Sequence, residues 1–364
     1  MTKYILFIAA YPTVDKQKEG MFQRIKAIDA EFEAYNRTYL SISLVSHKSK
    51  TEEIIGNVRI VYVNWFIHFV FISKMIKSAD YIYVHSLYNF KFLIGASLKG
   101  KNITLDLHGS VPEELEFYGE KLKSLFYNEV ERVAYKHVTN LIAVSYAMVD
   151  YYRKKRKLNE RIKCVVKPIY PINSISESKT DDVDSLKKSL NINDSNVVFV
   201  YSGNLQKWQN FELMIQCIRA MNNPNYRFII MTQEEERANE IVSKLPNSDS
   251  VVVKSVLPKD LNLYYSIAHY GFILRDDIVL NRVAAPTKLI EYLSYGLIPI
   301  VKTINIGDSV KMGYEYISYN EDLNGLSAKK SDKNEEVAAA VVFLAENRYI
   351  TGQVLNVDGG MVMS

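Results

Sequence analysis

A lysine and a glutamate three positions apart, Lys288 and Glu291, stand near the start of a predicted helix. Pro286 has the fixed φ suited to a first helical position, and Thr287 follows it. The free N–H groups and positive dipole end of a helix start suit a diphosphate, to which Lys288 adds a cation. Glu291, one turn further on, can accept hydrogen bonds from a pair of sugar hydroxyls. A nucleotide sugar presents these groups together; the alternative is a surface helix whose charged side chains are solvated.

A second candidate site lies in ITLDLHGSVPEE, where Asp106 and His108 end a predicted strand and Gly109 begins a loop. A histidine in this place can hydrogen-bond sugar hydroxyls or orient reacting groups, and a structural histidine is the alternative. Glu113 and Glu114 could contact an acceptor or supply acid to a helix start.

A third position is a glycine that directly follows a predicted strand. FVYSGNLQKWQ places Gly203 where backbone must approach another group closely, with Asn204 behind it and Lys207 as the nearest cation. Arg275 and Arg282 flank the helix described above, and one of them could add a charge. We include Arg282 in the predicted donor site with the three residues of this turn. A plain strand-to-helix turn is the alternative.

The segment KEGMFQRI near the N-terminus contains Gly20 and Arg24. Gly20 allows close backbone approach, and Arg24 faces the same end of the helix predicted over residues 21–33. Both residues could therefore lie close to a bound ligand; a solvated loop is the alternative.

Short apolar runs alternate with helical stretches along the chain, which is typical of parallel, doubly wound sheets. A polar stretch, SISESKTDDVD, separates two such series and is the expected linker. In such sheets, ligands bind beyond the carboxyl ends of the strands, at the switch in strand order. The predicted parts are an N-terminal acceptor-side domain over 1–173, the linker over 174–184, a C-terminal nucleotide-sugar-binding domain over 185–330 and a tail over 331–364.

Length and composition describe an ordinary globular protein with room for two cores. The chain has 364 residues, of which 48% are hydrophobic and 24% charged, and a net charge of +4 is too small to indicate nucleic-acid binding. Cys164 and Cys217 lie far apart without metal-ligand spacing, which favours a reduced setting. No apolar run reaches the ~18–20 residues that span a bilayer, and no signal-peptide cleavage site precedes the first strand pattern. We therefore expect a cytoplasmic location.

Two segments suit peripheral contact with the anionic inner face of a cell membrane. WFIHFVFI, residues 65–72, is apolar and aromatic, with Lys74 and Lys77 behind it. RKKRK, residues 153–157, is a basic cluster. A core segment and a solvated helix end are equally weighted alternatives.

The segment PTKLIEYLSYGLIPIV, residues 286–301, resembles the donor site of GT-B glycosyltransferases, especially the family-4-like enzymes that build bacterial capsule, O-antigen and exopolysaccharide. DLHGSVPEE and SGNLQKWQ are similar to loops of the two domains in that family. The resemblance implies two Rossmann-like domains that face a cleft, and sugar transfer from a nucleotide-diphosphate sugar with retention, without metal or other cofactor. It also implies an undecaprenyl-linked glycan acceptor, a ribose held by Glu291 and an active site lined by His108, with Asp106 as a second catalytic residue. KEGMFQRI resembles the N-terminal loop of that family, so the resemblance also implies that Gly20, Arg24 and Glu113 lie on the acceptor side.

Two positions depart from the family pattern. Val283 stands where many members carry a first glutamate, eight residues before Glu291, and Asn204 stands where arginine is frequent. These departures keep open a catalytically inactive binding protein as the alternative function.

The last residues resemble a different family. Residues 334–363, with the sequence YITGQVLNVDGG near their end, are similar to the C-terminus of short-chain dehydrogenase/reductases of the 3-oxoacyl-reductase type. The N-terminal T-G-x-x-x-G-x-G of that family is missing, and the pair Tyr151 and Lys155 lies in a basic helix. We interpret the tail as a graft without NADPH-dependent reductase activity, and expect it to make few contacts with the core. Its apolar face consists of Val337, Val341, Val342 and Leu344.

Overall fold

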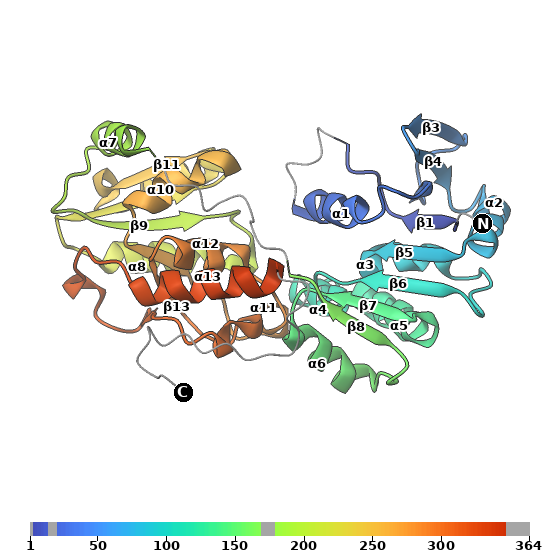
Figure 1. Ribbon diagram of the computed structural model, residues 1–364. Coiled ribbons are helices and arrows are strands. Elements are labelled where there is room, and N and C mark those ends of the chain that lie inside the picture. Colours follow the sequence, from blue (N-terminus) through green and yellow to red (C-terminus); the bar gives the residue numbers. More distant parts are fainter. Residues whose placement is uncertain (1–2, 14–19, 169–178, 347–364) are drawn as a thin grey trace. The chain divides into compact units, whose positions relative to one another are not determined.

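The structure, a computed structural model, describes residues 3–13, 20–168 and 179–346. The chain divides into two compact units, residues 1–169 and 170–364 (Figure 1). Each unit is built on its own sheet with helices between the strands. The two doubly wound α/β units predicted from the alternation of apolar runs and helical stretches are therefore present.

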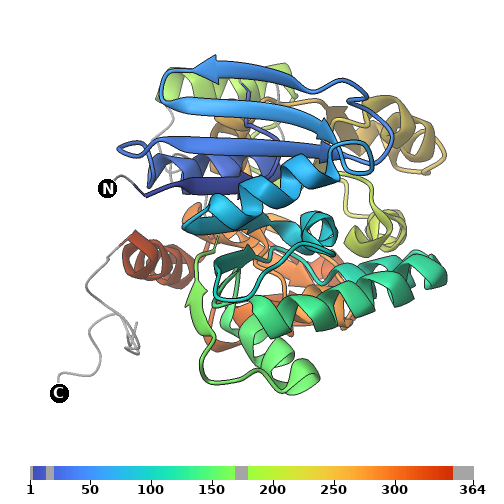
Figure 2. The same ribbon diagram turned by 90° about the vertical axis from the view of Figure 1, so that its right-hand side faces the viewer.

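The first unit contains a sheet of eight strands within residues 3–13 and 20–168. The strands are β1 (Ile5–Ile8), β2 (Arg37–Ser43), β3 (Thr51–Ile55), β4 (Val58–Asn64), β5 (Tyr81–His85), β6 (Asn102–Asp106), β7 (Asn140–Ala143) and β8 (Lys163–Val166). Their order is β3-β4-β2-β1-β5-β6-β7-β8, and Figure 2 shows the blue strands β2 to β4 in a row. The strand pairs are parallel except for the exposed β3, which forms an antiparallel hairpin with β4. Because β1 pairs with both β2 and β5, the strand order switches there, and a ligand site is expected beyond the ends of β1 and β5.

The helices of the first unit begin close to the carboxyl ends of the strands that precede them. They are α1 (Gly20–Ala30), α2 (Phe69–Ser78), α3 (Ser86–Phe90), η2 (Lys91–Leu93), α4 (Val111–Phe117), α5 (Lys121–His137) and α6 (Tyr146–Arg156). Ser145 caps α6, with its Oγ accepting from the N–H of Met148 at 3.0 Å. No helix in the described ranges of the chain is long and apolar enough to cross a membrane.

The second unit contains six strands, all parallel, within residues 179–346. They are β9 (Val197–Ser202), β10 (Tyr226–Met231), β11 (Val251–Lys254), β12 (Tyr270–Ile273), β13 (Ile298–Val301) and β14 (Ile317–Ser318). The order β11-β10-β9-β12-β13-β14 is that of a Rossmann sheet, with the switch between β9 and β12. Every residue of β9, β12 and β13 is buried, as expected of strands covered on both faces.

Helices cover both faces of this second sheet. They are α7 (Thr180–Ser189), η3 (Lys207–Gln209), α8 (Phe211–Ala220), α9 (Glu235–Val242), η4 (Ser248–Ser250), η5 (Pro258–Asp260), α10 (Leu261–Ile267), α11 (Val279–Arg282), α12 (Thr287–Ser294), η6 (Gly307–Lys311), η7 (Leu323–Gly325) and α13 (Asp332–Glu346). Met214 of α8 and Ala238 of α9 belong to one core, and Leu289 of α12 and Val337 of α13 to the other. A glycine follows the end of α12: Gly296 has φ +68°, and its N–H returns to the carbonyl of Leu293.

The linker expected over 174–184 differs from the structure at its C-terminal end. Residues 180–184 belong to α7, and residues 174–178 lie outside the described ranges. Asp181 and Asp182 in the first turn and the two lysines of the last turn complement the helix dipole. The polar composition of residues 180–184 therefore predicted a loop, although the placement of charges at the two ends of α7 favours a helix.

The prediction that the tail makes few contacts with the core is wrong for its described part. Asn334 is fully buried, donates to the carbonyls of Leu297 (3.0 Å) and Glu315 (2.9 Å), and accepts from the N–H of Glu315 (2.6 Å). Val337 and Ala338 are buried against α12. The small and apolar residues of α13 recur at helical spacing, and such a face can pack on any helix whose surface has a matching shape. The resemblance of α13 to a reductase segment therefore does not prevent it from packing on α12.

Candidate functional site

Predicted donor residues gather where β9 and β12 end, at the switch in strand order of the second sheet. Gly203 follows β9, Arg275 comes two residues after β12, and α12 carries Lys288 and Glu291 against β12. Open parallel sheets bind ligands at this place, because loops from adjacent strands diverge there.

Gly203 and Lys288 come from different elements and meet closely. The φ of Gly203 is +142°, a backbone conformation open to glycine, and a Cβ there would stand 3.1 Å from Lys288 Nζ and 3.4 Å from the Tyr201 hydroxyl. The absence of a side chain at this residue therefore leaves room for the ammonium, as the sequence predicted for a close approach.

Lys288 is a buried cation held by uncharged groups. Its Nζ donates to Gln209 Oε1 at 2.9 Å and lies 4.4 Å from the centre of the Tyr201 ring. Burial, together with the charge of neighbouring Arg275, holds the pKa of the Lys288 ammonium well below its usual range. An anion placed beside it would reverse this shift.

Arg275 is the second buried cation of this cluster. It is 5% exposed, its guanidinium stacks over Trp208 with 4.6 Å to the ring centre, and its Nε has no hydrogen-bond partner in the described part of the chain. Burial lowers the pKa of Arg275 to about 10, which still leaves it charged at neutral pH. A buried guanidinium with an unpaired N–H is an uncompensated charge, and this favours an anionic ligand.

Arg282, which we had placed in the donor site, lies elsewhere. It is exposed and its Nε pairs with Asp277 at 2.6 Å. Of the two arginines that flank the donor helix, the structure brings Arg275 to Lys288 and leaves Arg282 at the surface. The buried apolar strand that precedes Arg275 determines this difference, and the isolated sequence does not show which arginine faces inward.

Glu291 is the acidic member of the cluster. Tyr265 donates to its Oε2 at 2.9 Å, and the same hydroxyl lies 2.8 Å from Ser202 Oγ. Burial raises the pKa of Glu291, while the Tyr265 hydrogen bond and the charge of Lys288 oppose that shift. Within the described part of the chain Oε1 of Glu291 has no hydrogen-bond partner, so it remains available to accept from a ligand hydroxyl.

Tyr292 helps to fix this cluster through Ser202. Its hydroxyl accepts from the N–H of Ser202 at 3.0 Å, and its ring lies so close to Gly271 that a Cβ there would stand 2.3 Å from it. Gly271 is thus required for Tyr292 to reach the end of β9.

The remaining predicted donor residues lie at the margin of the cluster. Pro286 is the N-cap of α12 rather than its first residue, and Thr287 begins the helix without a side-chain cap. Asn204 and Lys207 are exposed, and the Asn204 carbonyl accepts from Tyr201 at 2.5 Å. Backbone N–H groups at the helix start therefore lack a side-chain cap, as an anion site requires.

In the first unit, Asp106 and Arg24 form a buried pair. Arg24 donates through Nε (2.9 and 3.0 Å) and Nη2 (2.5 Å) to the carboxylate, and through Nη1 to the carbonyl of Lys167 at 2.8 Å. Although burial raises it, the pKa of Asp106 is held well below its usual range by hydrogen bonds from His85 and Arg24. Both side chains are more than nine-tenths buried and satisfied by protein groups, so neither is presented to a ligand.

His108 lies beside this pair and is half-buried. Its ring stacks on His85, with centroids 4.5 Å apart and planes inclined by 28°. Burial and the charge of His85 lower the pKa of His108 to about 3, so it is neutral at pH 7. A neutral imidazole can accept from or donate to a sugar hydroxyl.

His85, Asp106 and His108 are also the three residues that could together hold a metal, with ligand atoms within 4.8 Å of one another. The Arg24 guanidinium, a cation, already occupies the Asp106 oxygens through its Nε and Nη2. Metal coordination needs convergent, unoccupied donors. The three residues therefore fit a metal ion poorly.

The other predicted acceptor-side residues are Glu113 and Gly20. Glu113 of α4 accepts from Tyr151 (2.5 Å) and Lys155 (2.6 Å) of α6, which fastens the two helices together. Gly20 is the first residue of α1, and the residues before it lie outside the described ranges.

The structure adds residues that sequence reasoning did not select. They are Tyr83 and His85 in the first unit and Tyr201, Ser202, Trp208, Gln209 and Tyr265 in the second. His85 could have been selected from the sequence, because it is the last residue of an apolar strand and His108 comes two residues after the end of another. The tyrosines carried none, since their hydroxyls act across elements distant in sequence.

Of the two segments expected at a membrane, the basic one is partly structural. Lys155 and Arg156 are mostly buried and pair with Glu131, whereas Arg153 is 60% exposed. In residues 65–72, Ile72 is buried, as expected of a core segment. Phe66, Ile67 and Val70 are exposed, as expected of a segment that contacts a membrane.

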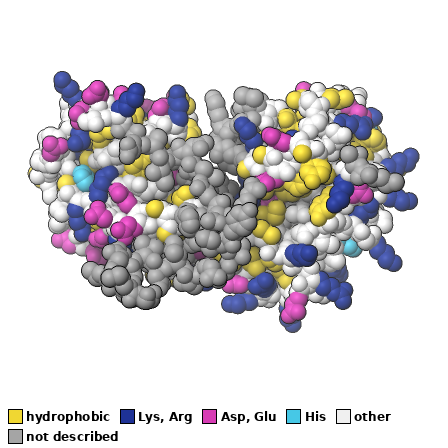
Figure 3. Space-filling view, viewed as in Figure 1, with side chains coloured by type: hydrophobic (Ala, Val, Ile, Leu, Met, Phe, Trp, Pro, Cys, Tyr) yellow, Lys and Arg dark blue, Asp and Glu magenta, His cyan; other side chains and the backbone are white. Residues whose placement is uncertain are grey.

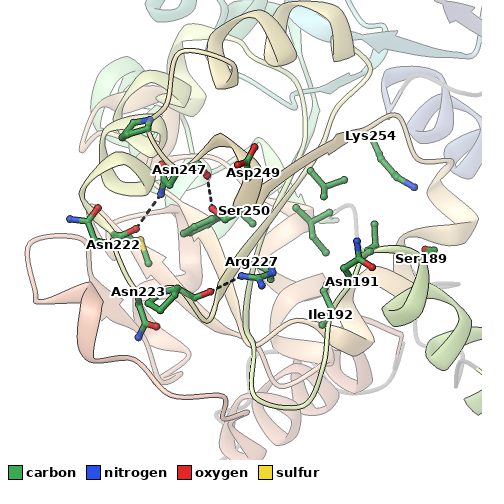
Figure 4. A pocket seen from close by; sticks show the side chains of 17 residues that line it. Ser189, Asn191, Ile192, Asn222, Asn223, Arg227, Asn247, Asp249, Ser250 and Lys254 are labelled. Atoms are coloured by element: carbon green, nitrogen blue, oxygen red, sulfur yellow. Dashed lines mark hydrogen bonds between the residues drawn. The ribbon is translucent and has the colours of Figure 1, made fainter.

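A hollow of about 640 Å³ lies in the second unit, away from the Lys288 cluster (Figure 4). Its lining comes mainly from segments that precede β9, β10 and β11, including Asn191, Asn223 and Asn247. Those segments lie at the amino ends of the strands, whereas the predicted donor residues follow their carboxyl ends. The hollow is therefore not part of the donor cluster.

Residues 182–350 match the model of the family glycosyl transferases group 1. This segment contains Gly203, Arg275, Lys288 and Glu291, so the match covers the cluster of the second unit.

Three solved structures resemble nearly the whole chain. WaaG, a glycosyltransferase involved in lipopolysaccharide biosynthesis, has a TM-score of 0.65 and 13% identity, covering 95% of this chain and 96% of its own. An alpha,alpha-trehalose-phosphate synthase (UDP-forming) from Burkholderia vietnamiensis has a TM-score of 0.65 at 10% identity, with the same two coverages. Anabaena Alr3699/HepE, solved in complex with UDP, has a TM-score of 0.61 at 12% identity, covering 95% and 90%. At such low identities, the TM-scores show that these proteins share the fold of this chain.

A partial match to reductases is also found, as expected from the tail. The 3-oxoacyl-[acyl-carrier-protein] reductase FabG of Chlamydia muridarum is 33% identical over 117 residues, which are 32% of this chain and 43% of the relative. FabG of Buchnera aphidicola subsp. Acyrthosiphon pisum is 34% identical over 101 residues, 38% of its length. The chain thus spans less than half of the curated relatives that it matches.

The fold and the family match agree on one assignment. The second sheet has Rossmann order, the first is doubly wound, and the structural relatives that share both are glycosyltransferases and sugar-phosphate synthases. Residues 182–350 match the glycosyl transferases group 1 model, within a chain that has the GT-B fold.

Proposed function

We propose that this protein transfers a sugar from a nucleotide-diphosphate sugar to a glycan acceptor. The observation that carries the proposal is the pair of buried cations, Lys288 and Arg275, without a carboxylate within 4 Å among the described residues. Burying charges without counter-charges costs several kcal/mol, and a diphosphate would offset that cost. UDP in the related Anabaena structure supports this ligand class.

Glu291 gives the donor site its second contact. Its carboxylate is fixed on one side by Tyr265, and it follows Lys288 on the same helix by about one turn. A ribose bound beside the diphosphate would present two hydroxyls to the other side of the carboxylate. This arrangement supports a nucleoside diphosphate rather than inorganic phosphate.

The chemistry required of the second unit is stabilisation of the departing diphosphate. Arg275 and the uncapped start of α12 offer positive charge that is already in place. Lys288, whose pKa is low in the free protein, gains its charge as the diphosphate binds beside it. Two protein cations can supply the neutralisation that a metal ion supplies in other phosphate sites. The proposal is therefore a metal-independent transfer, with retention of the anomeric configuration carried over from the family resemblance.

His108 would contribute from the first unit. It is neutral and half-buried, and it comes directly after the strand that holds the Arg24–Asp106 pair. In this role it hydrogen-bonds the transferred sugar or the acceptor hydroxyl, and the buried ion pair keeps its loop in place.

The acceptor would be a lipid-linked glycan, with undecaprenyl as the expected lipid, met at the inner face of the cell membrane. The first unit is basic: residues 1–169 hold 26 Lys and Arg against 17 Asp and Glu, whereas the whole chain has a net charge of +4. Leu122 and Leu125 at the start of α5 are 84% and 64% exposed, and Phe66 is 66% exposed. Figure 3 shows apolar side chains together with Lys and Arg on the surface of the first unit. These features support peripheral contact with an anionic bilayer and a cytoplasmic location.

A catalytically inactive binding protein is the second candidate. Val283, at the position where many relatives carry a first glutamate, is 2% exposed and hydrogen-bonded into α11 through its backbone. Because valine has no carboxylate, the contact that a first glutamate would make is missing here. An inactive protein would bind the donor as an enzyme does, but would neither transfer nor hydrolyse it.

Calorimetry with UDP, GDP, ADP and CDP, followed by turnover with the matching radiolabelled nucleotide sugars and a bacterial lipid extract, tests the proposal. We expect one nucleoside diphosphate to bind at micromolar concentration and its sugar to enter the lipid fraction. Binding without turnover would support the inactive protein. Absence of binding by all four in the folded protein would overturn the donor assignment, and NADPH oxidation above background would restore the reductase alternative.

A further inference from the structure

Two imidazoles lie against each other at the carboxyl edge of the first sheet. His85 is the last residue of β5, and Asp106, its register partner, is the last residue of β6, with His108 two residues beyond. The rings of His85 and His108 stack 4.5 Å apart, and His85 is only 1% exposed. His85 therefore forms the inner surface on which the His108 ring rests.

The proton on His85 can be assigned from its neighbours. Tyr83 has one hydroxyl proton, which it donates to Asp106 Oδ2 at 2.5 Å. The Tyr83 oxygen also lies 3.1 Å from His85 Nδ1, so in that contact it must accept. His85 thus carries a proton on Nδ1, directed toward Tyr83 and toward Asp106 Oδ2 at 3.6 Å. Asp106 orients His85 directly and through Tyr83.

The backbone that follows His85 is held in an unusual conformation. Ser86 has φ +68°, a left-handed value that few residues other than glycine adopt, and it is buried. Asn89 donates its side-chain amide to the His85 carbonyl at 2.6 Å. Such conformations cost roughly 1–3 kcal/mol and persist where the surroundings fix them. The position of His85 is therefore determined from both its ring and its backbone.

The stack leaves two polar atoms unpaired. His85 Nε2 and His108 Nδ1 are buried and have no hydrogen-bond partner in the part of the chain that the structure describes. An unpaired buried polar atom typically costs about 1–3 kcal/mol. Two aromatic or aliphatic residues would fill the same space without that cost, so stability alone does not explain a histidine pair here.

We propose that His85 is a positioning residue for His108: its ring, fixed by Tyr83 and Asp106, sets the plane of the His108 ring and the nitrogen that His108 presents to substrate. The proposal rests on the proposed function for the identity of the substrate, a sugar or acceptor hydroxyl. It extends that function by a chain of contacts from Arg24 through Asp106 and Tyr83 to His85 and His108. The buried Arg24–Asp106 pair thereby acts on the site without touching a ligand.

Spectra of the six histidines, labelled with ¹⁵N, test the proposal without reference to turnover. His85→Asn removes the stacking surface, and His85→Phe keeps a ring but removes the Nδ1 proton. We expect both variants to shift the His108 ring nitrogens or change their tautomer, whereas His137→Asn, at the end of α5, leaves them unchanged. Unchanged His108 ring signals in both folded His85 variants would overturn the proposal.

Kinetics distinguish positioning from general stability. A misplaced catalytic group costs roughly 10- to 100-fold in rate. We expect His85→Asn to lower kcat by about that factor while the Kd of the nucleoside diphosphate changes less than twofold, because the donor cluster lies in the other unit. Equal loss in both quantities would contradict the proposal. If the protein proves to have no transferase activity, the ring spectra still decide whether His85 orients His108.

Discussion

Lys288 Nζ lies 3.1 Å from the place that a Cβ on Gly203 would occupy. A methyl group there strains the backbone at φ +142° and displaces the ammonium from Gln209. We expect Gly203→Ala to weaken binding of the preferred nucleoside diphosphate by about 1.5 kcal/mol, roughly tenfold, as measured by calorimetry. Gly313→Ala is the matched control, because Gly313 also has a positive φ but faces open space. Equal affinities for the two variants would contradict the arrangement.

Arg275 rather than Arg282 should carry the second positive charge of the donor site. Arg275→Met keeps most of the side-chain volume over Trp208 and removes the charge, and should weaken diphosphate binding by about 1.5–3 kcal/mol. Arg282→Met should bind as the unaltered protein does, because its side chain is exposed and paired with Asp277. The reverse order of affinities would return Arg282 to the site.

Binding of a nucleoside diphosphate should take up protons. Burial and Arg275 hold the pKa of Lys288 low in the free protein, while Glu291 opposes this, and a bound diphosphate adds negative charge that raises it again. Between the free and bound pKa values, affinity therefore falls as pH rises. Calorimetry in buffers of different ionisation enthalpy measures the uptake, which Lys288→Met should abolish. Proton release on binding would show that another group dominates.

The folds of the two units followed from patterns of residues close together in sequence. The strands Tyr81–His85 and Ile298–Val301, for example, are apolar runs in the sequence, of the kind that alternates with helical stretches along the chain. The hairpin strand β3 was missed because all its residues are exposed, so no alternation of buried and exposed positions marks it.

The donor cluster was predictable only along α12. Lys288 and Glu291 share one helix, and helical spacing relates them directly. Their partners Arg275 and Tyr265 come from other elements, so only the register of β12 and the packing of α10 decide which side chains face inward. For Asp106 the sequence was misleading in the opposite way. A carboxylate at the end of a strand suggested a catalytic group, but in the structure its oxygens accept hydrogen bonds from Arg24.

Glu291→Ala should weaken nucleoside diphosphate binding by about 1.5–3 kcal/mol, the range for hydrogen bonds to charged groups. The loss should be much smaller for inorganic pyrophosphate, which lacks the ribose hydroxyls that Glu291 is proposed to hold. Tyr265→Phe should give a smaller effect of the same kind, because it frees the carboxylate without removing it. An equal loss for both ligands would place Glu291 beside the phosphates or in a purely structural role.

The helix α13 should stabilise the second unit, contrary to what its resemblance to a reductase segment suggested. Asn334 makes three hydrogen bonds to backbone groups of Leu297 and Glu315 and is fully buried. Asn334→Ala leaves those groups unpaired and should lower the free energy of unfolding by about 1–3 kcal/mol. Lys333→Ala, on the exposed side of the same helix turn, should change it by less than about 0.5 kcal/mol. Urea denaturation of the two variants decides the matter: similar midpoints would mean that α13 is only loosely attached. Since α13 packs on α12, which carries Lys288 and Glu291, Asn334→Ala should also weaken binding of the nucleoside diphosphate.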